Sequence, residues 1–190
     1  MLRKIAVTLL ALLPLSCLNA TPEGLSLLHG AHQGNPVLIQ SLTINGVDFN
    51  RMETLCGSGW SDPKGQSNAL LTMPHDSENR GRFYLTAQWT ELKSNVGYTG
   101  VIEARMSDLS VQQLSRPFGD VIVLFGPDGY LELSTSAPPD ETGQYNGRII
   151  ATTCATSGPG LPHDHWVWEN SRAQSMLEDE TPVPDMGCSR

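Results

Sequence analysis

The 190-residue sequence lacks a hydrophobic run long enough to cross a membrane as a helix. Its N-terminal apolar stretch, Ile5–Leu13, is less than half of the roughly 20 residues that a membrane-spanning helix needs. Positive charge is also scarce, because 12 basic residues stand against 20 acidic ones and the net charge is −8. We therefore expect neither an integral helical membrane protein nor a protein that binds nucleic acid.

Recognisable catalytic motifs are absent as well. There is no Gly-x-Ser-x-Gly sequence of the kind that presents a hydrolase nucleophile. The carboxylate pair Asp140-Glu141 lies in a polar run with no apolar setting to raise a pKa, and the glycine-rich run Ser157–Gly160 has no lysine to bind a phosphate. We expect a protein that is not an enzyme and that holds no cofactor.

Cysteine is rare, with four in the chain. Cys17 belongs to the N-terminal segment, which leaves Cys56, Cys154 and Cys188, and three thiols allow three alternative single disulfides. We favour a Cys56–Cys154 disulfide, because both residues flank the strand-rich body of the chain whereas Cys188 lies in a tail.

The first 20 residues have the layout of a secretory signal peptide: basic Arg3 and Lys4, then Ile5–Leu13, then a small-residue exit at Ala20. Loss of Arg3 and Lys4 with the signal changes the net charge from −8 to −10. Leu15-Ser16-Cys17 is a partial lipobox, in which Cys17 would become the acylated first residue. We expect a periplasmic protein, with a lipid-anchored protein of the bacterial envelope as the alternative.

After the signal, residues 21–36 mix Gly, Pro, His and Asn without periodicity, and we expect a loosely ordered segment there. A β domain is expected over residues 37–178 and an acidic tail over 179–190. The clearest local signal is Asn45-Gly46 between two apolar runs, because Asn-Gly supplies the positive φ values that a two-residue hairpin turn requires.

Alternating apolar and polar residues predict further strands. Arg82–Thr90 and Tyr98–Met106 form one expected antiparallel pair, and Val121–Phe125 is apolar enough to be a central strand buried on both faces. An Asp128-Gly129 turn leads on to the next strand, and Trp168–Leu177 has the residues of a short helix. The fold class we expect is mainly β: a single antiparallel β-sandwich or partly open barrel with one or two short helices.

Two histidines form one candidate site. His163 and His165, at positions i and i+2, would project from the same face of a strand and share a copper or zinc ion. His29 and His32 are the residues that would complete such a site. The alternative interpretation is that these histidines lie on the surface and bind nothing.

Tryptophans form the second candidate site. Trp89 lies in an alternating strand and is expected in the core, whereas Trp60, Trp166 and Trp168 lie in segments with loop composition. Indole rings on loops commonly anchor protein interfaces, so we expect these three to contact a protein partner.

Several features occur in an order that is similar to a known group of proteins. They are a strand and turn at Ile39–Gly46, a Cys-bearing Gly-rich loop, Met73-Pro74 at a strand end, a strand ending in Trp89, and an apolar strand with an Asp-Gly turn at Val121–Leu133. This order resembles that of small exported lipoproteins of unknown function encoded beside type VI secretion effectors, some of which are thought to be immunity proteins. The resemblance spans about residues 37–135 and does not extend beyond Gly143. It implies a protein-binding module, possessing no catalytic residues, that neutralises a secreted, basic antibacterial effector.

Overall fold

The computed structural model describes residues 24–32, 34–49, 53–57, 69–72, 81–113, 117–137 and 147–188. The expected signal peptide, Cys17 and Trp60 lie outside these residues. Within the described residues, no helix is both long and apolar enough to cross a membrane.

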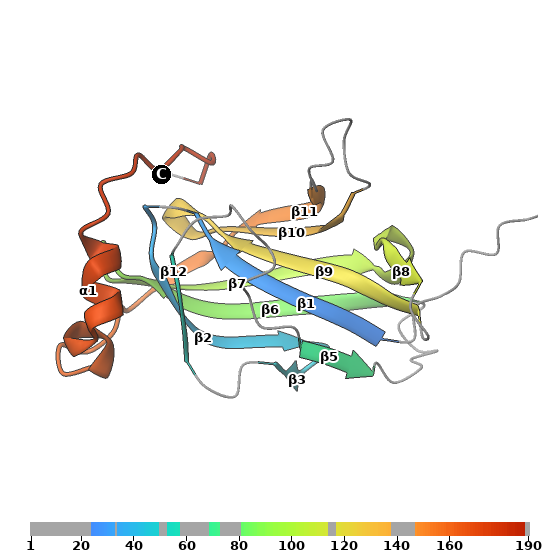
Figure 1. Ribbon diagram of the computed structural model, residues 1–190, viewed down its shortest axis with the longest axis horizontal. Helices are drawn as coiled ribbons and strands as arrows, with labels where there is room; N and C mark the ends of the chain where they lie inside the picture. Colours follow the sequence, from blue (N-terminus) through green and yellow to red (C-terminus); the bar gives the residue numbers. More distant parts are fainter. Residues whose placement is uncertain are drawn as a thin grey trace, which may run out of the picture.

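Two β-sheets pack face to face, as Figure 1 shows. Sheet A has the strand order β11-β10-β9-β1-β5, with β8 also paired to β9. Its strands are β1 (Gly24–Ala31), β5 (Ala69–Thr72), β8 (Val111–Gln113), β9 (Pro117–Phe125), β10 (Tyr130–Ser136) and β11 (Gly147–Cys154).

Sheet B has the order β12-β7-β6-β2-β3, with β4 also paired to β2. Its strands are β2 (Val37–Ile44), β3 (Val47–Asp48), β4 (Thr54–Cys56), β6 (Arg82–Glu91), β7 (Val96–Arg105) and β12 (Thr156–Gly158). Short helical turns are η2 (Met106–Asp108), η3 (Pro127–Gly129) and η4 (Trp166–Glu169), and the helix is α1 (Ser171–Leu177). The expectation of a mainly β sandwich is confirmed.

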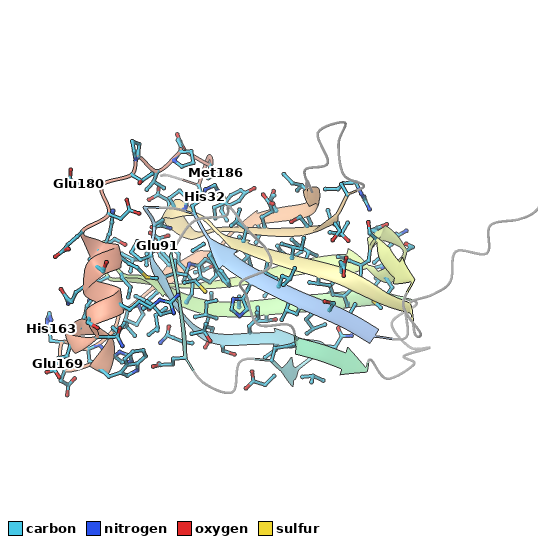
Figure 2. All side chains as sticks on the ribbon, in the orientation of Figure 1. His32, Glu91, His163, Glu169, Glu180 and Met186 are labelled. Atoms are coloured by element: carbon cyan, nitrogen blue, oxygen red, sulfur yellow. A yellow bond between two sulfur atoms is a disulfide. The ribbon has the colours of Figure 1, made fainter. Side chains whose placement is uncertain are left out.

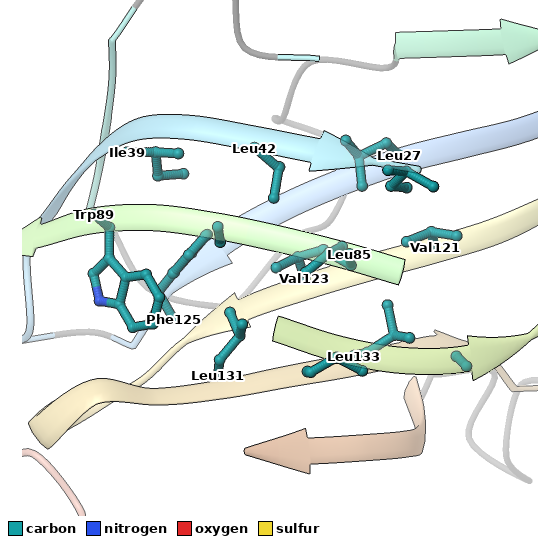
Figure 3. Close-up of a cluster of buried hydrophobic side chains, with 14 of the residues drawn as sticks. Leu27, Ile39, Leu42, Leu85, Trp89, Val121, Val123, Phe125, Leu131 and Leu133 are labelled. Carbon is teal, nitrogen blue, oxygen red and sulfur yellow. The ribbon is translucent and has the colours of Figure 1, made fainter. Parts of the chain in front are cut away.

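The core lies between the two sheets and follows the alternation of the sequence (Figure 3). Phe83, Leu85, Ala87 and Trp89 on β6 are fully buried, whereas Val101 on the outer face of β7 is 53% exposed. The residues of β9 from Val121 to Phe125 are all buried, which fits a strand flanked by β10 on one side and β1 on the other. The prediction of a central strand there is confirmed.

Both expected hairpin turns are present. Asn45 and Gly46 have φ values of 49° and 76°, so both central residues are left-handed, as a type I′ turn requires. The Asn45 side chain also accepts a hydrogen bond from the Tyr84 amide at 2.9 Å. At the second turn Asp128 and Gly129 have φ values of 56° and 79°, and a Cβ on Gly129 would lie 2.5 Å from Tyr98 Cδ1.

The loosely ordered segment predicted for residues 21–36 is wrong over Gly24–Ala31, which forms β1 inside sheet A. This strand pairs antiparallel with β5 and parallel with β9, so the sheet is not purely antiparallel. Leu25, Leu27 and Ala31 are buried in the main core, and their burial stabilises the strand. Its partner β9 lies some 90 residues later in the chain, so the pairing leaves no local sequence signal.

Helical structure is close to expectation at the C-terminus. The helix expected within Trp168–Leu177 is observed as α1, where the Asn170 side chain caps the amides of Arg172 and Ala173 at 3.0 and 3.1 Å. In the middle of the chain, the single helical turn η2 is followed by strand β8.

The predicted Cys56–Cys154 disulfide is wrong. Cys154 is bonded to Cys188, with their Cα atoms 5.5 Å apart, and Cys56 is a free thiol. The physical reason is that the two side chains point to opposite sides of the sandwich wall. Cys56 faces the core from β4 and is 1% exposed, whereas Cys154 lies on the exposed side of β11, where the C-terminal segment reaches it. Burial raises the pKa of Cys56 to about 12, so its thiol stays protonated and unreactive.

Glu91 connects the two sheets at the end of the sandwich where α1 lies (Figure 2). Glu91 is the last residue of β6 and lies on the same face of the strand as its buried residues. Its Oε1 accepts a hydrogen bond from the Gly129 amide at 2.9 Å. Burial raises the pKa of Glu91, and the nearby Asp128 charge raises it further, although the hydrogen bonds from Gly129 and Ser94 act in the opposite direction.

This raised pKa predicts a pH dependence of stability. A carboxyl group with a higher pKa in the folded than in the unfolded protein stabilises the fold only while it is protonated. The unfolding free energy contributed by Glu91 should therefore fall as the pH rises from its ordinary pKa of 4.5 through the raised value. Glu91→Gln keeps an acceptor for the Gly129 amide but cannot ionise. We expect its stability relative to the unsubstituted protein to increase steadily from pH 4 to pH 7. Urea unfolding across this range measures the difference, and a constant difference would contradict the prediction.

Candidate functional site

The segment after β12 forms a second, smaller hydrophobic cluster at the α1 end of the molecule. Its buried residues come from sheet B, from the turn after β6, from the loop after β12, and from η4 and α1. They are, in that order, Leu38, Leu92, Leu161, Val167 and Ala173. Trp168 packs against this cluster, and its Nε1 donates to the Pro162 carbonyl at 2.9 Å. The cluster holds residues 161–177 against the end of sheet B.

Asn95, in the turn between β6 and β7, fixes the start of this segment. Its Oδ1 accepts a hydrogen bond from the Leu161 amide at 2.9 Å, and its Nδ2 donates to the Leu161 carbonyl at 3.2 Å. The side chain therefore pairs with Leu161 as a neighbouring strand would. Gly160 allows the close approach, because a Cβ there would overlap the Asn95 carbonyl oxygen.

Two substitutions of Asn95 separate the contribution of its side-chain hydrogen bonds to stability from that of its backbone conformation, because its φ is 49°. Asn95→Gly keeps the left-handed conformation and loses the two hydrogen bonds, which should lower the unfolding free energy by about 1–2 kcal/mol. Asn95→Ala should cost about 1 kcal/mol more, because alanine is disfavoured at this φ. Urea unfolding of both variants tests this order, and equal losses would show that backbone strain contributes nothing.

The exposed feature of this end of the molecule is a cluster of Glu53, His165 and Trp166, which we call the indole platform. Trp166 Nε1 donates a hydrogen bond to Glu53 Oε2 at 2.6 Å, and His165 Nε2 lies 3.2 Å from the same oxygen. The rings of His165 and Trp166 are 5.6 Å apart between centroids. Trp166 is nevertheless 45% exposed, so one carboxylate holds a large, solvent-facing indole in place.

The hydrogen bonds of His165 define its tautomer. Nδ1 accepts from the Val167 amide at 3.3 Å, so the proton lies on Nε2 and points to Glu53. A carboxylate beside a histidine resembles part of a hydrolase triad, yet here neither ring nitrogen remains to take a proton from a nucleophile. The pair therefore positions the turn and the indole.

The structure separates the residues expected to bind a partner or a metal. Trp166 points outward, whereas Trp168 is half-buried on the second cluster. His163 is exposed near α1, as is Glu169 (Figure 2), and His29 is buried with Nδ1 3.5 Å from the Cys56 sulfur. Among the described residues, no group of three or more His, Cys, Asp or Glu side chains is arranged to hold a metal ion.

The C-terminal segment that carries His165 and Trp166 is acidic. Asp164, Glu169, Glu178 and Glu180 are exposed on the same C-terminal segment, where Arg172 is the exposed basic residue within residues 163–180. Such a field attracts a positively charged protein surface and speeds its association, an effect that salt weakens.

Sequence reasoning missed Glu53, because it lies 113 residues before Trp166 and becomes its neighbour only when β4 pairs with β2. Comparison of the chain with protein-family models, with curated proteins and with solved structures returned no match.

Proposed function

We propose that the protein is an exported, periplasmic protein-binding module that neutralises a secreted antibacterial toxin, and that it binds this partner through the indole platform. The observation that carries the proposal is Trp166, which is 45% exposed although its Nε1 is held at 2.6 Å from Glu53. An exposed indole costs solvation free energy, and a fixed one loses little conformational entropy on binding. Both properties are typical of an interface anchor.

Charge supports a basic partner. The chain carries 20 acidic and 12 basic residues, and the exposed acidic side chains of the C-terminal segment add to its negative field. Cationic substrate-binding clefts, such as those of nucleases, are complementary to that field. The similar order of features in small exported lipoproteins, some of which are thought to be immunity proteins, also favours the proposal, because an immunity protein blocks an effector by binding it.

A survival assay tests this function. The proposal expects the neighbouring gene to encode an exported toxin, which is produced in the periplasm of a sensitive bacterium with and without this protein. The proposal expects survival with the unsubstituted protein and killing with Trp166→Ala at equal abundance. Killing in the presence of the abundant, folded, unsubstituted protein contradicts the proposal. Calorimetric titration with copper and zinc tests the alternative, and stoichiometric binding that His163→Ala and His165→Ala abolish would favour a metal carrier instead.

A further inference from the structure

The C-terminal residues 179–188, which we call the strap, are anchored at both ends. At the first end, Lys93 Nζ donates to the Asp179 carbonyl, and the Thr181 carbonyl occupies the space that a Cβ on Gly34 would need. This places the start of the strap on the turn between β1 and β2. At the other end Cys188 is bonded to Cys154, the last residue of β11.

Sheet topology determines the path between these anchors. In sheet A, β1 and β11 are separated by β9 and β10. Three strand spacings of about 4.8 Å make about 14 Å, and the seven residues from Thr181 to Cys188 can reach about 24 Å. The strap therefore crosses the end of sheet A where β9 ends and β10 begins, and Figure 1 shows it rising from α1.

The strap lies on the outer face of sheet A. Leu131 faces the core, so its neighbour Tyr130 and the residue paired with Tyr130, Cys154, face outward. Tyr130 and Glu132 share this face, and the Tyr130 hydroxyl donates to Glu132 Oε2 at 2.8 Å. They are only 7% and 8% exposed although they point away from sheet B. The strap ends on Cys188, whose partner Cys154 pairs directly with Tyr130, so the last residues of the strap lie beside the buried Tyr130.

Between its two anchors the strap is irregular and lies at the surface. None of its residues is buried, it contains Pro182 and Pro184, and it has no regular secondary structure. Hydrogen bonds from the Thr181 amide to Asp179 and from the Gly187 amide to Asp185 lie within the strap. At its base, Asn35 is buried and its Nδ2 has no hydrogen-bond partner among the described residues, so opening would give this donor access to water.

We propose that the Cys154–Cys188 disulfide is a redox-operated latch, and that its reduction releases the strap and uncovers the Tyr130–Glu132 face of an otherwise intact sandwich. The S–S bond breaks, each sulfur gains one electron and one proton, and a dithiol reductant is oxidised to its own disulfide. The third cysteine cannot exchange with the latch, because Cys56 is in the core and its pKa is about 12. The device is independent of the indole platform.

Hydrogen exchange of the full-length protein, read by mass spectrometry with and without dithiothreitol, tests the latch. Reduction should speed exchange at least tenfold in peptides covering the strap and residues 126–132, while peptides from β6 and β7 keep their rates. Cys188→Ser without reductant should reproduce the reduced pattern. Cys56→Ala, the matched control, should keep the oxidised pattern until reductant is added.

Two results would overturn the latch. Unchanged exchange in the strap after complete reduction, verified by thiol counting, would show that non-covalent contacts hold it. Loss of protection throughout β6 and β7 in both reduced protein and Cys188→Ser would show that the disulfide is a general staple of the fold.

Discussion

Replacing Trp89 by alanine should lower the free energy of unfolding by about 3–5 kcal/mol. Trp89 is fully buried on β6 of sheet B, and its ring lies across Phe125 from β9 of sheet A with centroids 5.0 Å apart. It also stacks on Tyr98 at 5.6 Å. Truncation therefore removes the side chain that fills the space between the sheets and leaves a cavity that the surrounding strands cannot close.

Two further variants sharpen this prediction. Trp89→Phe keeps a ring and removes an indole N–H that has no hydrogen-bond partner among the described residues, so its loss of stability should be clearly smaller. Tyr84→Ala, the matched control on the outer face of the same strand, should change stability by no more than about 0.5 kcal/mol. Urea unfolding measures all three, and a Trp89→Ala loss no larger than that of Tyr84→Ala would contradict the assigned core.

Replacing Trp166 by alanine should weaken binding to the proposed toxin partner by about thirtyfold to a thousandfold, the range that corresponds to losing an interface hot spot of about 2–4 kcal/mol. The melting temperature should stay close to that of the unsubstituted protein, because the ring is 45% exposed. Calorimetric titration of the purified pair measures the affinity.

The variant Trp166→Phe separates the ring from its hydrogen bond to Glu53. It keeps an aromatic surface but loses the 2.6 Å contact that orients it, so its affinity should fall between those of the unsubstituted protein and Trp166→Ala. Tyr84→Ala serves again as the control, since it removes an exposed aromatic ring from a different face and should leave affinity unchanged. An affinity for Trp166→Ala equal to that of the control would remove Trp166 from the interface.

Local sequence signals predicted the parts of this fold that local physics determines. Asn45-Gly46 is a hairpin turn because Asn and Gly tolerate positive φ, and the alternation in Arg82–Thr90 places Trp89 in the core because side chains alternate across a strand. The two indoles of Trp166 and Trp168 have different surroundings for a non-local reason. Val167 enters the second cluster between them, which turns one ring outward and the other against that cluster.

Pairings between distant segments were not predictable. β1 is a strand because β9 lies beside it, and its Gly and His residues resemble a loop when they are considered alone. The disulfide depends on the path of the strap across sheet A, which brings Cys188 to Cys154 and away from the buried Cys56. The burial of Glu91, in contrast, was predictable from the sequence, because it continues the alternation of buried residues in β6 two positions after Trp89.

Hydrogen exchange of the protein with and without the proposed toxin partner tests the central claim most directly. The account predicts that binding slows exchange in peptides covering residues 161–170 and 53–57, which contain the indole platform, and leaves the peptides of β6 and β7 unchanged. Protection of β6 and β7 on the outer face of sheet B, with residues 161–170 exchanging as in the free protein, would contradict it.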